Sequence, residues 1–287
     1  MNAIFCGCVR NSSQHLAKIF RNFEHLESLF NKSLYLFVEN DSMDQTVSIL
    51  NDWGARKPHF KLLSYTGLDA IRASRTQRLA FCRNIILQEI RSAGYSDYEC
   101  VIMLDMDEVN SAPIDSMGVQ SALSFLMSSD QVGAVTAWQE NYYDLWALRE
   151  RVYFPVDIWE RCLAQSLTGE LSDSEIYRSV LGRYSLSFIS NHEPTEVTSA
   201  FGGLALYKRS ALLSTPTVYS GERDLIIATQ SGYQFAKIQQ CEHVSFHSGM
   251  VSYGYKIFIH PSLVNSSLSA EINPSFFRSI LIKENQN

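Results

Sequence analysis

Residues 100–109, with the sequence CVIMLDMDEV, decide the fold and the site that this chain predicts. Five residues from Cys100 to Leu104 form a continuous apolar run of the length of a buried strand. Asp105 and Asp107 follow it at once. Two carboxylates one residue apart can share a divalent cation, and Mg²⁺ or Mn²⁺ prefers such oxygen ligands. We therefore predict a metal site at Asp105 and Asp107, just past the end of a buried strand.

Upstream of this stretch, predicted strands alternate with predicted helices. Short apolar runs indicate strands, and apolar residues at three- and four-residue spacing indicate the buried faces of helices. The strands are expected at 3–9, 34–38, 60–63 and 100–104, and the helices at 16–30, 47–53 and 76–92. This alternation predicts an α/β fold with helices on both faces of a sheet that is parallel in this half. No linker or repeat interrupts residues 1–287, so we expect a single domain.

Polar residues follow the first, second and fourth predicted strands. Ligands of such sheets bind beyond the carboxyl ends of the strands. We therefore expect these residues to meet at one edge and to form the binding site. They are Arg10, Asn11, Glu39, Asn40, Asp41, Asp105 and Asp107.

The pattern changes after residue 110. A helix is expected at 119–127, strands at 134–138 and 204–207, and a helix at 222–229, and residues 235–246 are read as strand and bend. Residues 141–192 are rich in aromatic side chains and weakly periodic. A loop of this length in a compact domain is usually a binding region or a lid.

Composition excludes several classes of protein. With a net charge of −6, the chain is a poor candidate for binding nucleic acid, which requires clustered Lys and Arg. Its six cysteines lack the paired spacing of a zinc site, so we expect buried free thiols. The sequence contains neither a signal peptide nor an apolar run of membrane-spanning length. We expect a cytoplasmic protein, and peripheral contact with the inner face of the membrane is compatible with this.

A second enzyme class uses the same letters. Phosphatases of the haloacid-dehalogenase type carry DxDx[TV] after an apolar strand, and LDMDEV satisfies that pattern. Asp105 would then be the covalent nucleophile and Asp107 the acid and base. That motif normally closes the first strand of its domain, whereas here three strand–helix units precede it. The phosphatase is therefore an alternative rather than the main prediction.

Four segments in this order resemble the GT-A glycosyltransferases. LDMDE resembles their DxD motif, SAFGGLALYK their acceptor-side loop and strand, SGERDL their acidic region, and CEHVSFH their late metal-binding histidine. A finer resemblance, to capsule-associated mannosyltransferases and their bacterial relatives, rests on FVENDSMD and RTQRLAFCRN.

The resemblance implies a fold and a function. The fold would be a mixed sheet flanked by helices, with the donor bound by residues 1–110 and the acceptor by residues 111–260. The protein would be a Mn²⁺- or Mg²⁺-dependent enzyme that moves a sugar from a UDP- or GDP-sugar to a glycan or lipid-linked acceptor, in surface polysaccharide synthesis. A non-catalytic carbohydrate- or nucleotide-binding protein that retains this scaffold is a further alternative.

The resemblance also implies roles for individual residues. Asp107 would chelate the metal, and Asp105 would contact metal-bound water or the donor ribose. His247 is preferred over His243 as the late ligand, and Glu222 or Asp224 would be the catalytic base, although ERD replaces the usual adjacent acidic pair. The residues expected around the nucleotide and its diphosphate are Arg10, Glu39, Arg75, Arg78 and Arg83.

Overall fold

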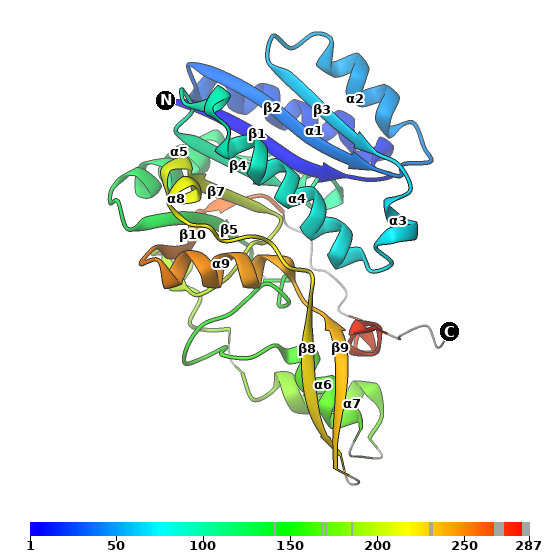
Figure 1. The fold of residues 1–287 in the computed structure, drawn as a ribbon. Coiled ribbons are helices and arrows are strands. Elements are labelled where there is room, and N and C mark those ends of the chain that lie inside the picture. Colours follow the sequence, from blue (N-terminus) through cyan, green and yellow to red (C-terminus); the bar gives the residue numbers. More distant parts are fainter. Residues whose placement is uncertain are drawn as a thin grey trace.

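The computed structural model describes residues 1–140, 142–167, 169, 171–184, 186–229, 232–266 and 273–282. It is an α/β structure with an eight-stranded sheet and a separate three-stranded sheet (Figure 1). The large sheet carries the helices on its two faces, and the small sheet extends away from it beside α6 (Ile158–Ser166) and α7 (Asp173–Leu181). In the part of the chain that the structure describes, no helix is both long enough and apolar enough to cross a bilayer.

The predicted alternation in the first half of the chain is confirmed. The strands are β1 (Asn2–Val9), β2 (Lys32–Asn40), β3 (Phe60–Tyr65) and β4 (Cys100–Leu104), and all of their pairings with one another are parallel. The helices between them are α1 (Ser13–Leu26), α2 (Thr46–Gly54), the short α3 (Leu68–Ile71) and α4 (Arg75–Arg91), with the 3-10 turns η1 (Glu27–Leu29) and η2 (Ala93–Tyr95).

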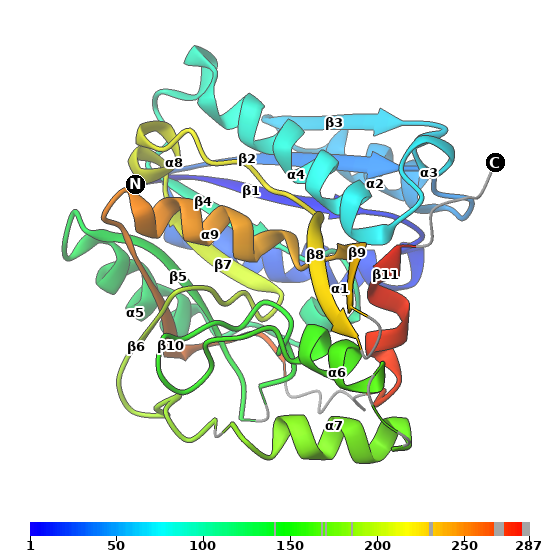
Figure 2. The ribbon, with the colours of Figure 1, turned by 60° about the horizontal axis from the view of Figure 1, so that its bottom comes forward.

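Alternate residues of the strands build two cores, one on each face of the sheet. Ile4 and Cys6 pack under α4 and α9 (Glu242–Ser252), whereas Ala3 and Phe5 pack against α1, α2 and α5 (Ser116–Met127). Figure 2 shows α4 and α9 side by side on the first of these faces. Since successive strand residues point to opposite faces, one continuous apolar run serves both cores.

The second half of the sheet is mixed. Its strand order is β3-β2-β1-β4-β7-β5-β10-β6, and β7 (Leu204–Lys208) lies antiparallel between β4 and β5 (Val132–Trp138). β10 (Lys256–Val264) and β6 (Thr195–Val197) complete the sheet. The remaining elements are η3 (Glu108–Asn110), α8 (Arg209–Ser214) and η4 (Phe276–Ile280). The predicted helix at 119–127 and the strands at 134–138 and 204–207 are confirmed.

Two expectations in this half are wrong. Residues 222–229 form a strand, β8 (Glu222–Thr229), which pairs antiparallel with β9 (Gly232–Gln239) and, through it, with β11 (Leu281–Ile282). The β-branched Ile226, Ile227 and Thr229 favour a strand, and Ile226 lies opposite Phe235.

The second wrong expectation is the bend at 240–246, where α9 begins instead. The buried residues His243, Phe246, His247 and Met250 recur at three- and four-residue spacing, which defines one helical face. The region 141–192 is not one continuous loop, because its described residues include α6 and α7.

Candidate functional site

A pocket of about 380 Å³ lies at the carboxyl ends of β1 and β4. It brings together seven of the predicted residues: Arg10 and Asn11 after β1, Asn40 at the end of β2, Arg75 and Arg78 on α4, and Asp105 and Asp107 after β4. The convergence follows from the parallel pairing of β1 with β2 and β4, which brings their carboxyl ends to one edge.

Hydrogen bonds fix the segment that carries the two acids. The Asp105 amide donates to the Gly203 carbonyl at 2.9 Å, and Asn110 Nδ2 donates to the carbonyls of Asp105 and Gly203 at 2.8 and 2.7 Å. Gly203 has a φ of 82°, and a Cβ there would lie 2.7 Å from Val109 Cγ1. Only glycine therefore suits this close approach of the two loops.

Asp107 caps the short helix η3, whose first residue is Glu108. Its Oδ1 accepts a hydrogen bond from the Val109 amide at 3.2 Å. The backbone that follows Asp107 thus fixes its carboxylate, which lines the pocket.

Arg83 links this loop to α9. Its side chain is 3% exposed, its Nη2 lies 2.7 Å from Asp105 Oδ1, and its Nη1 pairs with Glu242 Oε1. The guanidinium also lies over the Phe201 ring, 5.1 Å from the centroid. A buried cation requires such compensation. Arg83 therefore fixes Asp105 from inside the protein, rather than extending into the pocket.

The two acids carry negative charge that the protein offsets only in part. Burial raises the pKa of Asp105 to about 6, against the effect of Arg83, and repulsion from Asp107 adds to the increase. Burial also raises the pKa of Asp107, and Glu108 contributes to this. Such a pair fits a divalent cation with two protein carboxylates, since Mg²⁺ usually takes its other ligands from phosphate and water.

In the described ranges, no group of three or more His, Cys, Asp or Glu residues is arranged to hold a metal, so no third side chain of these types completes a metal site with Asp105 and Asp107. His247 is instead in the core on α9. Its ring nitrogens lie 3.2 Å from Ser199 Oγ and 2.8 Å from Tyr207 Oη. Burial, with Arg83 nearby, lowers the pKa of His247 to about 3. Its neighbour His243 stacks on Phe201 with ring centroids 3.8 Å apart. Both histidines are buried, and neither lines the pocket that holds Asp105 and Asp107.

Glu39 and Asp41 flank Asn40, which lines the pocket at the end of β2, but neither acid lines the pocket itself. Glu39 is 2% exposed, and its carboxylate accepts from the Ser42 amide at 2.7 Å and from Ser64 Oγ at 2.5 Å. Asp41 has a φ of 51° and accepts from the amides of Gly67 and Asp69. In this structure both carboxylates accept hydrogen bonds that hold the segments after β2 and β3, and their predicted contact with the nucleotide stays a prediction.

Glu222 and Asp224 begin the hairpin of β8 and β9. Glu222 bonds to Gln77 on the first turn of α4 and lies 3.6 Å from Lys237 Nζ. Asp224 is exposed. Neither lines the pocket that holds Asp105 and Asp107.

Two acids that the sequence analysis did not single out lie closer to the pair. Glu242 opens α9 and reaches Asp105 through Arg83. Asp144 accepts from the Gly202 amide at 3.0 Å, and burial raises its pKa, with a further contribution from Asp105. The helical spacing from His243 to Met250 would have revealed Glu242 as the acid at a helix start, whereas no local pattern reveals Asp144.

Comparison with known proteins identifies the fold. No protein-family model and no curated protein matches the chain. Among solved structures, the mannosyltransferase PcManGT from Pyrobaculum calidifontis, in complex with GDP-Man and Mn²⁺, matches with a TM-score of 0.54 and 14% identity over 96% of this chain. The chain spans 59% of that protein's length.

Weaker matches are TarS from S. aureus and the glucosyl-3-phosphoglycerate synthase from Mycobacterium tuberculosis. For TarS residues 1–349 the TM-score is 0.41, with 11% identity, over 77% of this chain and 50% of that one. For the synthase the TM-score is 0.38, with 14% identity, over 75% and 60%. The mixed sheet flanked by helices is the GT-A fold, as the resemblance implied.

Proposed function

We propose that this protein is a metal-dependent glycosyltransferase that uses a nucleotide-diphosphate sugar. The observation that carries the proposal is the pocket at the carboxyl ends of β1 and β4, where Asp105 and Asp107 meet Arg75 on a GT-A fold. PcManGT, which has this fold, was solved with GDP-Man and Mn²⁺, which supports a GDP-sugar as donor. A UDP-sugar is the other candidate.

The residues of the pocket divide the work of binding a charged donor. Asp105 and Asp107 would hold Mn²⁺ or Mg²⁺, which when bound supplies a Lewis acid for the charge that develops on the departing diphosphate. Arg75 and Arg78 line the same pocket and attract the phosphates. Arg83 keeps Asp105 in place, because its guanidinium is already divided between two carboxylates.

The general base is proposed among three acids. Glu222 and Asp224 are the residues that the resemblance implies. Asp144 is the third, because it lies beside Gly202, next to the loop that contacts Asp105, and its raised pKa suits an acceptor of protons. Substituting each by its amide separates them: the base variant loses turnover while its donor affinity stays unchanged.

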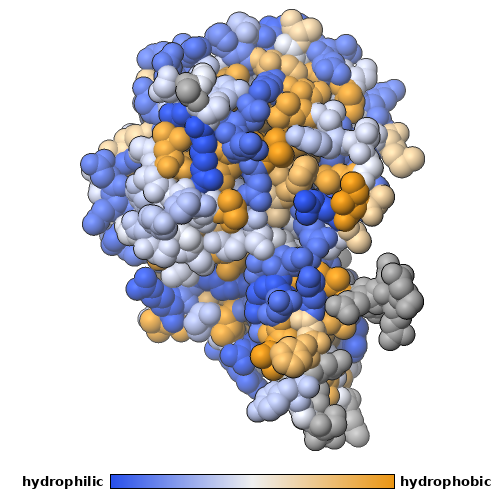
Figure 3. All heavy atoms as spheres, viewed as in Figure 1, coloured by the Kyte–Doolittle hydropathy of each residue, from blue (hydrophilic) through white to orange (hydrophobic). Residues whose placement is uncertain are grey.

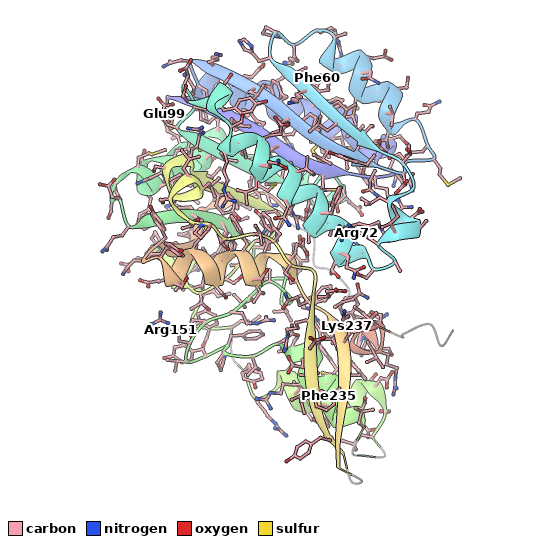
Figure 4. The ribbon with its side chains drawn as sticks, in the orientation of Figure 1. Phe60, Arg72, Glu99, Arg151, Phe235 and Lys237 are labelled. Carbon is pink, nitrogen blue, oxygen red and sulfur yellow. The ribbon has the colours of Figure 1, made fainter. Side chains whose placement is uncertain are left out.

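The acceptor is proposed to be a glycan or a lipid-linked sugar, in surface polysaccharide synthesis. The hairpin of β8 and β9 offers a surface for peripheral membrane contact, since Tyr233 and Phe235 are 79% and 78% exposed. Figure 4 shows Phe235 beyond Lys237 along the hairpin, and Figure 3 shows hydrophobic residues gathered there below a hydrophilic band.

A panel of nucleotides tests the proposal. Thermal unfolding is measured with UDP, GDP, CDP, ADP and dTDP, each with Mn²⁺ and with chelator. A ligand at about one hundred times its Kd adds roughly 2.7 kcal/mol to the free energy of unfolding. The proposal predicts stabilisation by one nucleotide that is lost on chelation. Absence of any shift, together with release of phosphate from simple phosphomonoesters, would favour the phosphatase with Asp105 as nucleophile. Donor binding without turnover for any acceptor would favour a non-catalytic binding protein.

A further inference from the structure

A second pocket, of about 710 Å³, lies between α1 and the segment that follows β4. Four residues of α1 line it at spacings of three or four: His15, Lys18, Arg21 and His25. The opposite wall includes Glu108 and Ser111. Sites for small molecules commonly have volumes of about 300–1,000 Å³, so this pocket has room for a sugar-sized ligand.

The wall facing α1 is held in place by one buried side chain. Asn22 on α1 is 5% exposed; its Nδ2 donates to the carbonyls of Asn110 and Ala112 at 2.9 and 2.7 Å, and its Oδ1 accepts from the Ile114 amide at 3.2 Å. His15 Nδ1 lies 3.3 Å from Ser111 Oγ across the pocket. The two walls are therefore fixed relative to each other before a ligand binds.

The basic and acidic side chains of α1 and of the turn that follows it lie on different sides of the helix. Its neighbouring acids point away, with Glu24 accepting from Trp53 Nε1 at 2.9 Å and Glu27 pairing with Lys57 at 3.0 Å. Lys18 and Arg21 form no ion pair with any described residue, although the chain as a whole is acidic. Two cations without an ion-pair partner in the described ranges therefore line a pocket in which Glu108 is the one acid among the described lining residues.

We propose that this pocket binds the anionic group of a hydroxylated ligand, a phosphorylated or carboxylated saccharide. Lys18 and Arg21 attract the anion. Glu108 repels a second anion but accepts hydrogen bonds from hydroxyl groups, and Ser111 both donates and accepts. A polyanion without hydroxyl groups would interact only with Lys18 and Arg21. A neutral sugar would form hydrogen bonds only with Glu108 and Ser111.

The pocket adjoins the site of Asp105 and Asp107. After β4, Asp107 lines the first pocket and the next residue, Glu108, lines the second. After β1, Asn11 lines the first pocket, and His15, in the first turn of α1, lines the second. On the proposed glycosyltransferase function, the ligand here would be the charged part of the acceptor. Binding of the anion itself does not depend on that function.

Nuclear magnetic resonance of the histidine rings tests the proposal on the full chain. Glucose 6-phosphate is titrated against wild type at constant ionic strength, with glucose and inorganic phosphate as separate probes. The His15 and His25 signals should shift with glucose 6-phosphate and respond at least tenfold more weakly to either probe alone. The double variant Lys18→Gln/Arg21→Gln should weaken the response at least tenfold, and its thermal unfolding shows whether it is folded.

Arg75→Gln, in the first pocket, is the matched control and should leave these shifts unchanged. Unmoved ring signals in wild type, or shifts that survive in the double variant and vanish in Arg75→Gln, would overturn the proposal. Failure of the nucleotide panel with normal shifts at His15 and His25 would instead remove only the acceptor role, because it would refute the glycosyltransferase and leave the anion pocket in place.

Discussion

Two groups of ion pairs in this molecule use the same residue types in opposite surroundings. The Arg83 side chain is 3% exposed and pairs with Asp105, which is 24% exposed, and with Glu242, which is 4% exposed. On the hairpin of β8 and β9, the Arg223 and Lys237 side chains are 38% and 42% exposed in their pairs with Glu160 and Glu222. Buried charges require their partners, whereas exposed pairs contribute little to stability. The first group therefore holds Asp105 in position, whereas loss of an ion pair in the second group should change the free energy of unfolding little.

The largest effect is expected at Asp107. Asp107→Asn keeps a side chain that can cap η3 through the Val109 amide but removes the charge that would hold the cation. Release of nucleoside diphosphate from the donor that the panel identifies should fall by on the order of 100-fold or more, as expected when several kcal/mol of charge stabilisation are lost. Asp107→Ala should be at least as slow, and its circular dichroism should match that of wild type. Full turnover by either variant in chelated buffer would rule out the metal role.

Arg83→Met should cause the largest loss of stability. It leaves Glu242 and Asp105 without their shared cation, at a cost of about 3–5 kcal/mol in the free energy of unfolding. Urea denaturation measures the loss. The matched control on the hairpin, Arg223→Met, removes a partly exposed pair and should cost under about 1 kcal/mol. Equal losses in the two variants would contradict the distinction between the two groups of ion pairs.

The core histidines should make stability depend on pH. The pKa of His247 is lowered to about 3 in the folded protein, against about 6.5 in an unfolded chain, so unfolding takes up a proton between these values. The contribution of His247 is present above pH 6.5 and is lost as pH falls towards 3, by about 1.4 kcal/mol per pH unit. His247→Gln should show a shallower loss than wild type in denaturation series from pH 7 to 4. Parallel curves would be evidence against a buried neutral ring.

The smallest effect is expected at an exposed side chain in the hairpin of β8 and β9. Phe235 is 78% exposed, so Phe235→Ser should change the free energy of unfolding by no more than about 0.5 kcal/mol and leave nucleotide binding unchanged. Its co-sedimentation with vesicles that contain anionic lipid should decrease if the hairpin contacts membranes. A large loss of stability would show that the Phe235 side chain packs against the protein in solution.

The sequence predicts the first half of the fold well because its signals are local. Each strand and helix predicted up to Leu104 has its own periodicity, and their alternation determines the parallel order, whereas the short α3 was not predicted. The same reasoning predicts that Arg10, Asn11, Asp105 and Asp107 meet, which they do in one pocket, and Arg75, which the resemblance implied, lines that pocket too.

The second half depends on contacts between distant residues, which no local pattern contains. The antiparallel place of β7 between β4 and β5 and the reach of Glu242 to Arg83 are of this kind. The predicted helix at 222–229 is a strand, whose pairing with β9 the local pattern did not reveal. Glu39 was found at the right edge, but its burial and its bonds to Ser42 and Ser64 could not be foreseen.

The central claim is that Asp105 and Asp107 hold a divalent cation together with a nucleoside diphosphate. Electron paramagnetic resonance of free Mn²⁺, titrated with protein in the presence of GDP or UDP, tests it directly. The account predicts that wild type removes the free Mn²⁺ signal with one equivalent bound in the presence of the correct nucleotide, and that Asp107→Asn binds at least tenfold more weakly. Equal Mn²⁺ binding by the two proteins, or none by wild type with either nucleotide, would contradict it.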